Sequence, residues 1–132
     1  MRYLSAQELL VLHALVIEET GGSDGVRDIS LLASATAKPQ AQFGGKELYS
    51  GIFLKAVVLL EAVVNYHAFV DGNKRTGFVA TARFLFLNGY TFSGSNKDVE
   101  RTILLIATKE MQVGDIAAWL KKNSKRNRNT RG

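Results

Sequence analysis

The side chains best suited to chemistry in this sequence lie between His67 and Arg75. A histidine accepts a proton near neutral pH, as the activation of a hydroxyl nucleophile requires. Asp71 is a hard oxygen donor of the kind that Mg²⁺ prefers, and Gly72 lets the backbone approach an anion closely. Together these residue types favour removal of a proton beside a bound phosphate.

The elements on either side would bring these groups together. From Leu48 to Tyr66 apolar residues recur at intervals of three and four and fill much of the rest, which predicts a buried central helix. Asn73 to Leu87 predicts a second helix, stopped by Asn88 and Gly89. The amides of residues 73 to 76 would then be unsatisfied at the positive end of that helix, where phosphate binds.

Lys74 and Arg75 occupy the first turn of this second helix. The helix dipole disfavours cations there unless an anion neutralises them, so their position supports a phosphate site. Phe69 is apolar in an otherwise polar connection, and we expect it to anchor the connection to the core. Each residue alone has a simpler explanation, because a histidine at a helix end is commonly a surface or capping residue.

The remaining segments also predict helices. Ser5 and Glu8 have the spacing of a capping box, which places the start of a helix there. A glycine-rich loop over residues 21 to 28 leads into a short helix that ends near Ala37. Helices from about 98 to 109 and from about 115 to 122, with Val113-Gly114 as the only break between them, complete the chain.

Residues 38 to 47 differ from these helical segments. They contain Pro39, Gly44 and Gly45 around the aromatic Phe43, a composition that predicts a mobile loop or a short hairpin. We call this segment the flap. Because Gly77 lies inside a strong helical pattern, it indicates close packing against a neighbouring helix.

Three further assignments are structural. His13 has no catalytic partner near it in the sequence, so a structural role is expected for it. Arg27 and Asp28 could form a local ion pair that orders the glycine-rich loop. Aromatic residues at helical spacings, such as Phe84, Phe86 and Trp119, predict core positions.

The composition is that of one globular domain. Of the 132 residues, 46% are hydrophobic and 22% are charged, which excludes a disordered chain. Cysteine is absent, so disulfides, thiolate zinc sites and cysteine nucleophiles are excluded. The chain begins without a secretory signal and has no apolar run long enough to cross a bilayer, so we expect a cytoplasmic protein with no membrane partner.

The net charge of +5 arises from the end of the chain, which is rich in Lys and Arg. We expect one domain over residues 1–122 and a basic, disordered tail over residues 123–132. The tail lacks interleaved aromatic residues, which argues against a nucleic-acid-binding arm.

The stretch from His67 to Arg75 resembles the signature of the Fic/Doc family, His-x-Phe-x-Asp/Glu-Gly/Ala-Asn-Gly/Lys-Arg, at every fixed position. Residues from about 3 to 122 also look like the death-on-curing (Doc) branch, notably in the segments 21–28 and 84–90. The resemblance implies an all-α fold: a compact bundle of about six helices with the flap between the second and central helices.

The resemblance also implies a role for each residue of the motif. His67 would be the catalytic base, Phe69 the anchor of the motif, and Asp71 the ligand of Mg²⁺. The flap would align the target segment. The remaining members would bind the phosphates of the substrate ATP: Gly72, Asn73, Lys74 and Arg75.

Doc-type proteins are toxins that transfer the γ-phosphoryl group of ATP to a threonine of elongation factor Tu and so inhibit translation. The resemblance implies this protein kinase activity, and a small antitoxin protein whose disordered tail folds into a groove beside the nucleotide site. Doc-type proteins can carry an Arg two residues before the motif histidine, where this chain has Asn65.

Two other functions remain open. AMP-transferring relatives usually carry Gly where this chain has Lys74 and a second Arg where it has Phe78, so both residues favour the Doc type. A catalytically weak domain that acts as a binding or regulatory module is the second alternative. The intact His67, Asp71 and Asn73 argue against it.

Overall fold

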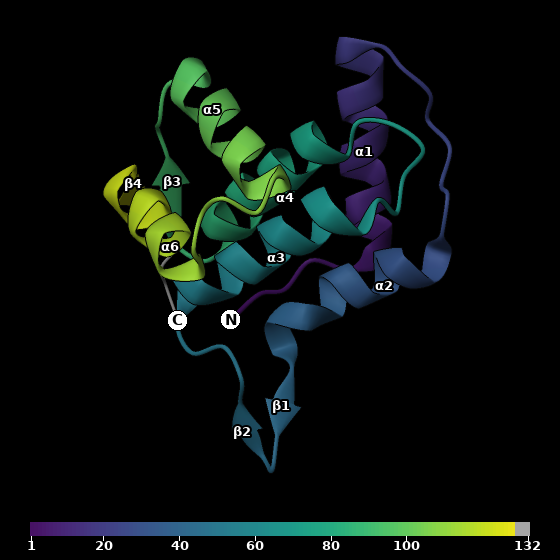
Figure 1. The fold of residues 1–132 in the computed structure, drawn as a ribbon. Helices are drawn as coiled ribbons and strands as arrows, with labels where there is room; N and C mark the ends of the chain where they lie inside the picture. Colours follow the sequence, from purple (N-terminus) through teal and green to yellow (C-terminus); the bar gives the residue numbers. More distant parts are fainter. Residues whose placement is uncertain (129–132) are drawn as a thin grey trace.

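A computed structural model describes residues 1–128 and confirms the helical fold, with two short strand pairs as the sheet structure of this part (Figure 1). Its helix count and the position of the flap agree with the prediction from sequence. The helices are α1 (Ala6–Thr20), α2 (Ile29–Ala37), the 3₁₀ helix η1 (Lys38–Gln40), α3 (Ile52–Tyr66), α4 (Asn73–Leu87), α5 (Asn96–Ala107) and α6 (Val113–Lys122). The strands are β1 (Gln42–Phe43), β2 (Lys46–Glu47), β3 (Tyr90–Phe92) and β4 (Ser124–Arg126).

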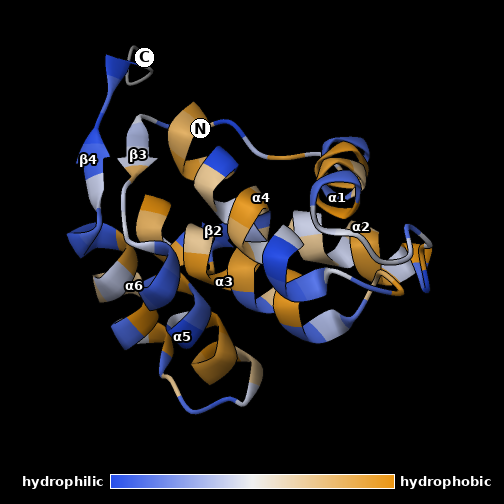
Figure 2. Ribbon diagram, turned by 90° about the horizontal axis from the view of Figure 1, so that it is seen from above, coloured by the Kyte–Doolittle hydropathy of each residue, from blue (hydrophilic) through white to orange (hydrophobic). Residues whose placement is uncertain are grey.

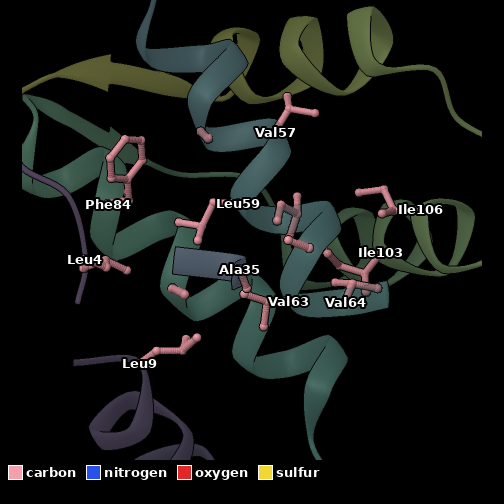
Figure 3. Close-up of a cluster of buried hydrophobic side chains, with 14 of the residues drawn as sticks. Leu4, Leu9, Ala35, Val57, Leu59, Val63, Val64, Phe84, Ile103 and Ile106 are labelled. Atoms are coloured by element: carbon pink, nitrogen blue, oxygen red, sulfur yellow. The ribbon is translucent and has the colours of Figure 1, made fainter. Parts of the chain in front are cut away.

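Helix α3 forms the centre of the fold because its sequence is apolar on nearly all sides. It packs against α2, α4, α5 and α6 (Figure 1). Figure 3 shows Leu59 and Val63 of α3 in a cluster of buried side chains with Phe84 of α4 and Ile103 of α5. This core fixes the position of α3 and therefore the place where it ends.

Helices α3 and α4 approach closely because Gly77 has no side chain. A Cβ atom at this position would lie 2.7 Å from Val64 Cγ2, closer than two carbon atoms pack. The close packing predicted for Gly77 is therefore confirmed. Since the two helices are held side by side, the residues that connect Tyr66 to Asn73 are held at one end of both.

The capping box predicted at the start of α1 is also confirmed. Ser5 Oγ accepts from the Glu8 amide at 3.0 Å, and the Glu8 carboxylate accepts from the Ser5 amide at 3.0 Å. Asp28 caps α2, where its carboxylate accepts from the amides of Ser30 and Leu31. These bonds fix the start of α1 and of α2 and thereby the ends of the loop between them.

The flap is a two-stranded hairpin, one of the two forms predicted for it. Gln42 pairs with Glu47 and Phe43 pairs with Lys46, and the hairpin extends away from the helices (Figure 1). Phe43 is 79% exposed. Beneath the hairpin, the buried ammonium group of Lys55 donates to the Pro39 carbonyl at 2.9 Å.

The expectation of a disordered tail from residue 123 is wrong for residues 124 to 126. They form β4, which is antiparallel to β3 with Tyr90 opposite Arg126 and Phe92 opposite Ser124. The sequence does not predict this strand because the segment is hydrophilic (Figure 2) and has no apolar alternation. Residues 129–132 of the expected tail lie outside the described residues.

Two smaller predictions are also wrong. Val113 and Gly114 lie in the first turn of α6, so the break after α5 falls earlier, around Lys109, which has a positive φ of 60°. Phe86 is 40% exposed and lies under the guanidinium group of Arg83, whereas Phe84 is fully buried as predicted. Within residues 1–128, no helix is both long enough and apolar enough to cross a membrane.

Candidate active site

The candidate site is built on the connection between α3 and α4. His67 follows the last residue of α3 and has a left-handed backbone with φ 55°, and Gly72 precedes α4 with φ 77°. A residue other than glycine in this conformation costs about 1–3 kcal/mol, so the surrounding structure must hold His67 in place. The side chain of His67 is exposed to solvent.

The middle of the connection is buried. Phe69 is 1% exposed, and its ring stacks on that of His13 with centroids 3.7 Å apart and planes 3° apart. The side chain of Asn73 binds the Phe69 backbone from both sides: Oδ1 accepts from its amide at 3.1 Å and Nδ2 donates to its carbonyl at 3.0 Å. The Asn73 side chain therefore shapes the connection and is not directed at a ligand.

His13 links α1 to the same connection. It is 2% exposed, and its Nε2 donates to the carbonyl of Asp71 at 2.8 Å. A Cβ atom on Gly72 would lie 2.9 Å from Ile17 Cδ1, so the Ile17 side chain of α1 packs directly against the backbone of Gly72. The structural role of His13 is thus to hold the connection to α1 through its hydrogen bond to Asp71 and its stacking on Phe69.

The start of α4 presents donors to solvent. The amides of Asn73, Lys74 and Arg75 have no hydrogen bond in the described part of the chain, as expected for the first turn of a helix. The sequence also predicts a free amide at Thr76, but this amide donates to the Gly72 carbonyl at 3.0 Å. Three unpaired amides at a positive helix end are suited to bind an anion, and we call this place the anion site.

Lys74 and Arg75 are exposed and form no ion pair within residues 1–128. Both cations therefore stand uncompensated at the positive end of the α4 dipole. A bound phosphate would satisfy the amides and both side chains together, which is the arrangement expected from the sequence.

Asp71 presents an exposed carboxylate at the edge of this anion site. Its Oδ1 accepts from the Gly72 amide at 3.1 Å and its Oδ2 accepts from the Ser23 amide at 3.4 Å, which orients the group. Within residues 1–128 no three acidic or histidine side chains gather to hold a metal ion. A single carboxylate fits Mg²⁺ when phosphate oxygens and waters complete the shell, so Asp71 suits an ion that arrives with a nucleotide.

Arg27 has a different role from the ion pair considered for it. Its Nε donates to the His67 carbonyl at 2.6 Å and its Nη2 donates to the Tyr66 carbonyl at 3.1 Å. No ion pair joins Arg27 to Asp28 among the described residues. Hydrogen bonds from the Ser30 hydroxyl and the Leu31 amide are the main causes that lower the pKa of the Asp28 carboxyl, and the charge of Arg27 adds a smaller effect in the same direction.

Comparison with known proteins identifies the family. A model described as the Fic/DOC family matches residues 3–85. Toxin Doc of Mycolicibacterium smegmatis is 37% identical over 121 residues, covering 89% of this chain and 90% of the relative. Protein kinase doc of Escherichia phage P1 is 30% identical over 122 residues, covering 92% and 95%.

This chain belongs to the Fic/DOC family. The matched region ends within α4 and includes the whole connection between α3 and α4, so the residues that carry the Fic/DOC motif are those that the structure brings together. His13 and Arg27, which hold the motif, also lie within the matched region.

A cleft of about 350 Å³ adjoins the Fic/DOC motif between α4 and α5. Lys74 and Arg75 of the motif contribute to its lining, together with apolar residues that include Phe78, Val99 and Leu104. Asn96 and the acidic Glu100 of α5 also line the cleft, so it has two cations at the motif, an apolar surface and one carboxylate.

A second cleft of about 360 Å³ lies along the last turns of α3. Its lining includes Glu61, Asn65 and Tyr66 of α3, and also Lys38. Burial raises the pKa of the Glu61 carboxyl, and the charge of Lys38 partly opposes this effect. Asn65 thus lines a solvent-accessible cleft beside Tyr66, the last residue of α3.

Proposed function

We propose that this chain is a Doc-type toxin that transfers the γ-phosphoryl group of ATP to a protein hydroxyl group. One observation carries the proposal: the exposed His67 is joined by a short, rigidly held connection to the anion site at the start of α4. A base and a phosphate site are the pair of groups that phosphoryl transfer to a hydroxyl requires. The names of the relatives, Toxin Doc and Protein kinase doc, agree with this proposal.

In this reaction His67 would take the proton of the target hydroxyl as its oxygen attacks the γ-phosphorus atom. A new oxygen–phosphorus bond forms, the bond to the bridging β,γ-oxygen breaks, and ADP leaves with that electron pair. The amides of α4 would hold the phosphates, while Lys74 and Arg75 offset the charge of the transferring group.

Asp71 would hold Mg²⁺ at the edge of the phosphate site. The chemistry that the ion would supply there is positive charge that offsets the charge of the phosphates. The amides of Ser23 and Gly72 keep the Asp71 carboxylate directed toward this edge through their hydrogen bonds. Asn73 would contribute through its backbone amide, because its side chain is occupied by Phe69.

The proposed target is a threonine of elongation factor Tu, and its modification would inhibit translation. The flap would align the target segment. Lys74 and Phe78 favour transfer of the γ-phosphoryl group, because AMP-transferring relatives usually have Gly and Arg at these positions. AMP transfer is the alternative that the experiment must exclude.

The test incubates the chain with Mg²⁺ and ATP labelled at either the α- or the γ-phosphate, with elongation factor Tu as the target. We expect label on the target from γ-labelled ATP only, and its loss in His67→Ala. Label from the α-phosphate would show AMP transfer instead. If neither labelled position gives label that depends on His67, the proposal is contradicted and a binding module is favoured.

A matched pair of variants separates the metal role of Asp71 from a general loss of charge. We expect Asp71→Asn to lower transfer and to shift the Mg²⁺ requirement to higher concentration. Asp115 is an exposed carboxylate in the first turn of α6, outside the motif. Asp115→Asn is therefore expected to leave the rate and the Mg²⁺ requirement unchanged.

We also propose that the antitoxin segment occupies the cleft between α4 and α5. Its apolar lining suits the apolar face of a helix, and Lys74 and Arg75 at the same cleft suit an acidic residue on that helix. A segment bound there would cover both cations of the phosphate site, so inhibition would follow from occupancy alone.

Leu104 tests this placement because it is 57% exposed and lines the cleft. We expect Leu104→Lys to weaken binding of the cognate antitoxin at least tenfold and to reduce the rescue of growth by the antitoxin. Leu15→Lys on α1 is the control, since Leu15 is 55% exposed and is not part of the cleft. Equal binding by both variants would contradict the placement.

A further inference from the structure

The end of α3 is completed by a residue that lies outside the motif. Arg27 donates one hydrogen bond to the His67 carbonyl and another to the Tyr66 carbonyl, at 2.6 and 3.1 Å. Carbonyls at the end of a helix have no partner within the helix itself. The positive charge of Arg27 also complements the negative end of the helix dipole.

His67 occupies a position where this support is needed. Helices commonly place glycine in the left-handed conformation that follows the last turn, and a backbone amide then bonds back to the helix. Here the left-handed residue is a histidine with φ 55°. Within the described residues no backbone amide after Tyr66 bonds back to α3, so the guanidinium group takes the place of the usual cap.

The loop before α2 places Arg27 against the connection. The amide of Arg27 and that of Asp28 both donate to the Ala68 carbonyl, at 2.8 and 3.1 Å, and the Val70 amide donates to the Gly25 carbonyl at 2.9 Å. A Cβ atom on Gly25 would lie 3.0 Å from Val70 Cγ2, so the two segments run in close contact. These backbone hydrogen bonds therefore hold the backbone of Arg27 where its side chain can reach the carbonyls of Tyr66 and His67.

We propose that Arg27 is the positioning residue of His67: its guanidinium group fixes the left-handed backbone from which the imidazole reaches the target hydroxyl. The effect on transfer rests on the proposed function, whereas the effect on the His67 backbone does not. Because Arg27 is exposed, removing it buries no unpaired charge, and the main consequence falls on the two carbonyls that it binds.

The test compares Arg27→Gln and Arg27→Lys with Arg101→Gln. Arg101 is an exposed arginine that pairs with Asp98 on α5 and serves as the control. Kinetics are measured with γ-labelled ATP. The His67 backbone is followed by NMR without nucleotide, since a left-handed residue gives a strong nuclear Overhauser effect between its own amide and α protons.

We expect Arg27→Gln to lower kcat for phosphoryl transfer between tenfold and a hundredfold, on the order found when a reacting group is misplaced by about an ångström. KM for ATP should change less than threefold. The nuclear Overhauser effect between the amide and α protons of His67 should weaken. Arg27→Lys retains the charge and should recover part of kcat; it also serves if the Gln variant does not fold.

Three results would overturn the proposal. An unchanged kcat would show that the two hydrogen bonds are dispensable. A lower kcat with an intact His67 signal would mean that Arg27 acts on the reacting groups itself, and a selective rise of KM would make it a phosphate ligand. If the unmodified chain transfers no phosphate, the proposed function fails by itself, and the NMR signal alone decides whether Arg27 fixes His67.

Discussion

Two features of the structure require a glycine at position 72: the conformation of its backbone and the packing of α1 against it. Its φ of 77° lies in the region that side chains disfavour, and a Cβ atom would contact Ile17 Cδ1 at 2.9 Å. Ile17 Cδ1 is the end of a flexible side chain and can move, but the backbone conformation cannot change without moving the amides of α4. The positive φ is therefore a stronger reason for glycine at position 72 than the contact with Ile17.

We predict that Gly72→Ala lowers the free energy of unfolding by about 1–3 kcal/mol. It should also weaken ATP binding, because the amides that follow would be displaced. Urea unfolding and calorimetric titration with ATP measure the two effects. Gly114→Ala is the control: a Cβ atom on Gly114 would have no neighbour within 4 Å and the residue has no positive φ, so this change should not lower stability.

The motif residues can be found from sequence because their types carry the chemistry, but their division of tasks cannot. The sequence predicts that Asn73 binds phosphate, yet its side-chain amide is hydrogen-bonded to the backbone of Phe69. His13 lies four residues after Leu9 and four before Ile17 on the buried side of α1, a spacing that could have placed it in the interior. Nothing local in the sequence joins Arg27 to His67, because that contact depends on how two distant segments pack.

Among the elements, the flap is bound to α3 by one buried charge, that of Lys55. The Lys55 side chain is 1% exposed and its ammonium group lies 3.3 Å from the half-exposed Glu47 carboxylate, in addition to its bond to the Pro39 carbonyl. The base of the hairpin is thus tied to α3 by the Lys55 side chain, in addition to the packing of η1 on α3.

We predict that Lys55→Met releases the flap while the helices remain folded. Replacing a buried charge by an apolar group of similar length often has little effect on stability, but both contacts to the flap are lost. Trypsin should cleave after Lys46 faster in the variant than in the unmodified chain, at equal melting temperature. Glu47→Gln keeps the bond to Pro39 and should show a smaller increase. Equal cleavage in all three chains would contradict the prediction.

Helices with strong local signals are predicted closely, and elements made by pairing are not. The predicted bounds of α4 are those observed, because Gly72 and Asn88-Gly89 limit an uninterrupted helical pattern. The predicted central helix begins at Leu48, whereas α3 begins at Ile52, since Gly51 with φ 87° interrupts the backbone. β4 exists only through its bonds to β3, which no pattern within residues 124 to 126 could indicate.

At the scale of the molecule, the final strand closes the fold at the end far from the motif. Arg126 donates to the Tyr90 hydroxyl at 3.1 Å and lies over its ring, and the Ser93 amide donates to the Asn123 carbonyl at 2.8 Å. The ring of Phe92, a residue of β3, packs against Phe78 of α4 and Trp119 of α6.

We predict that a chain ending at Asn123 loses about 0.6–3 kcal/mol of stability, from three cross-strand pairs of roughly 0.2–1 kcal/mol each. Its phosphoryl transfer measured well below the melting temperature should be unchanged, because the motif connection is intact. A chain ending at Arg128 keeps β4 and is the control. Loss of activity without loss of stability would mean that this end of the chain takes part in the reaction.

The two ends of the described chain meet on either side of one turn. Arg2 exchanges two hydrogen bonds of 2.7 Å with the Asn88 side chain, and the Asn127 amide donates to the Gly89 carbonyl at 2.8 Å. Because α4 has 15 residues, this turn is about 22 Å from the proposed phosphate site at the start of α4. A short linker could therefore join the two ends, with new termini opened at the Gly44-Gly45 turn, and the resulting circular permutant would keep every helix and the connection that carries His67.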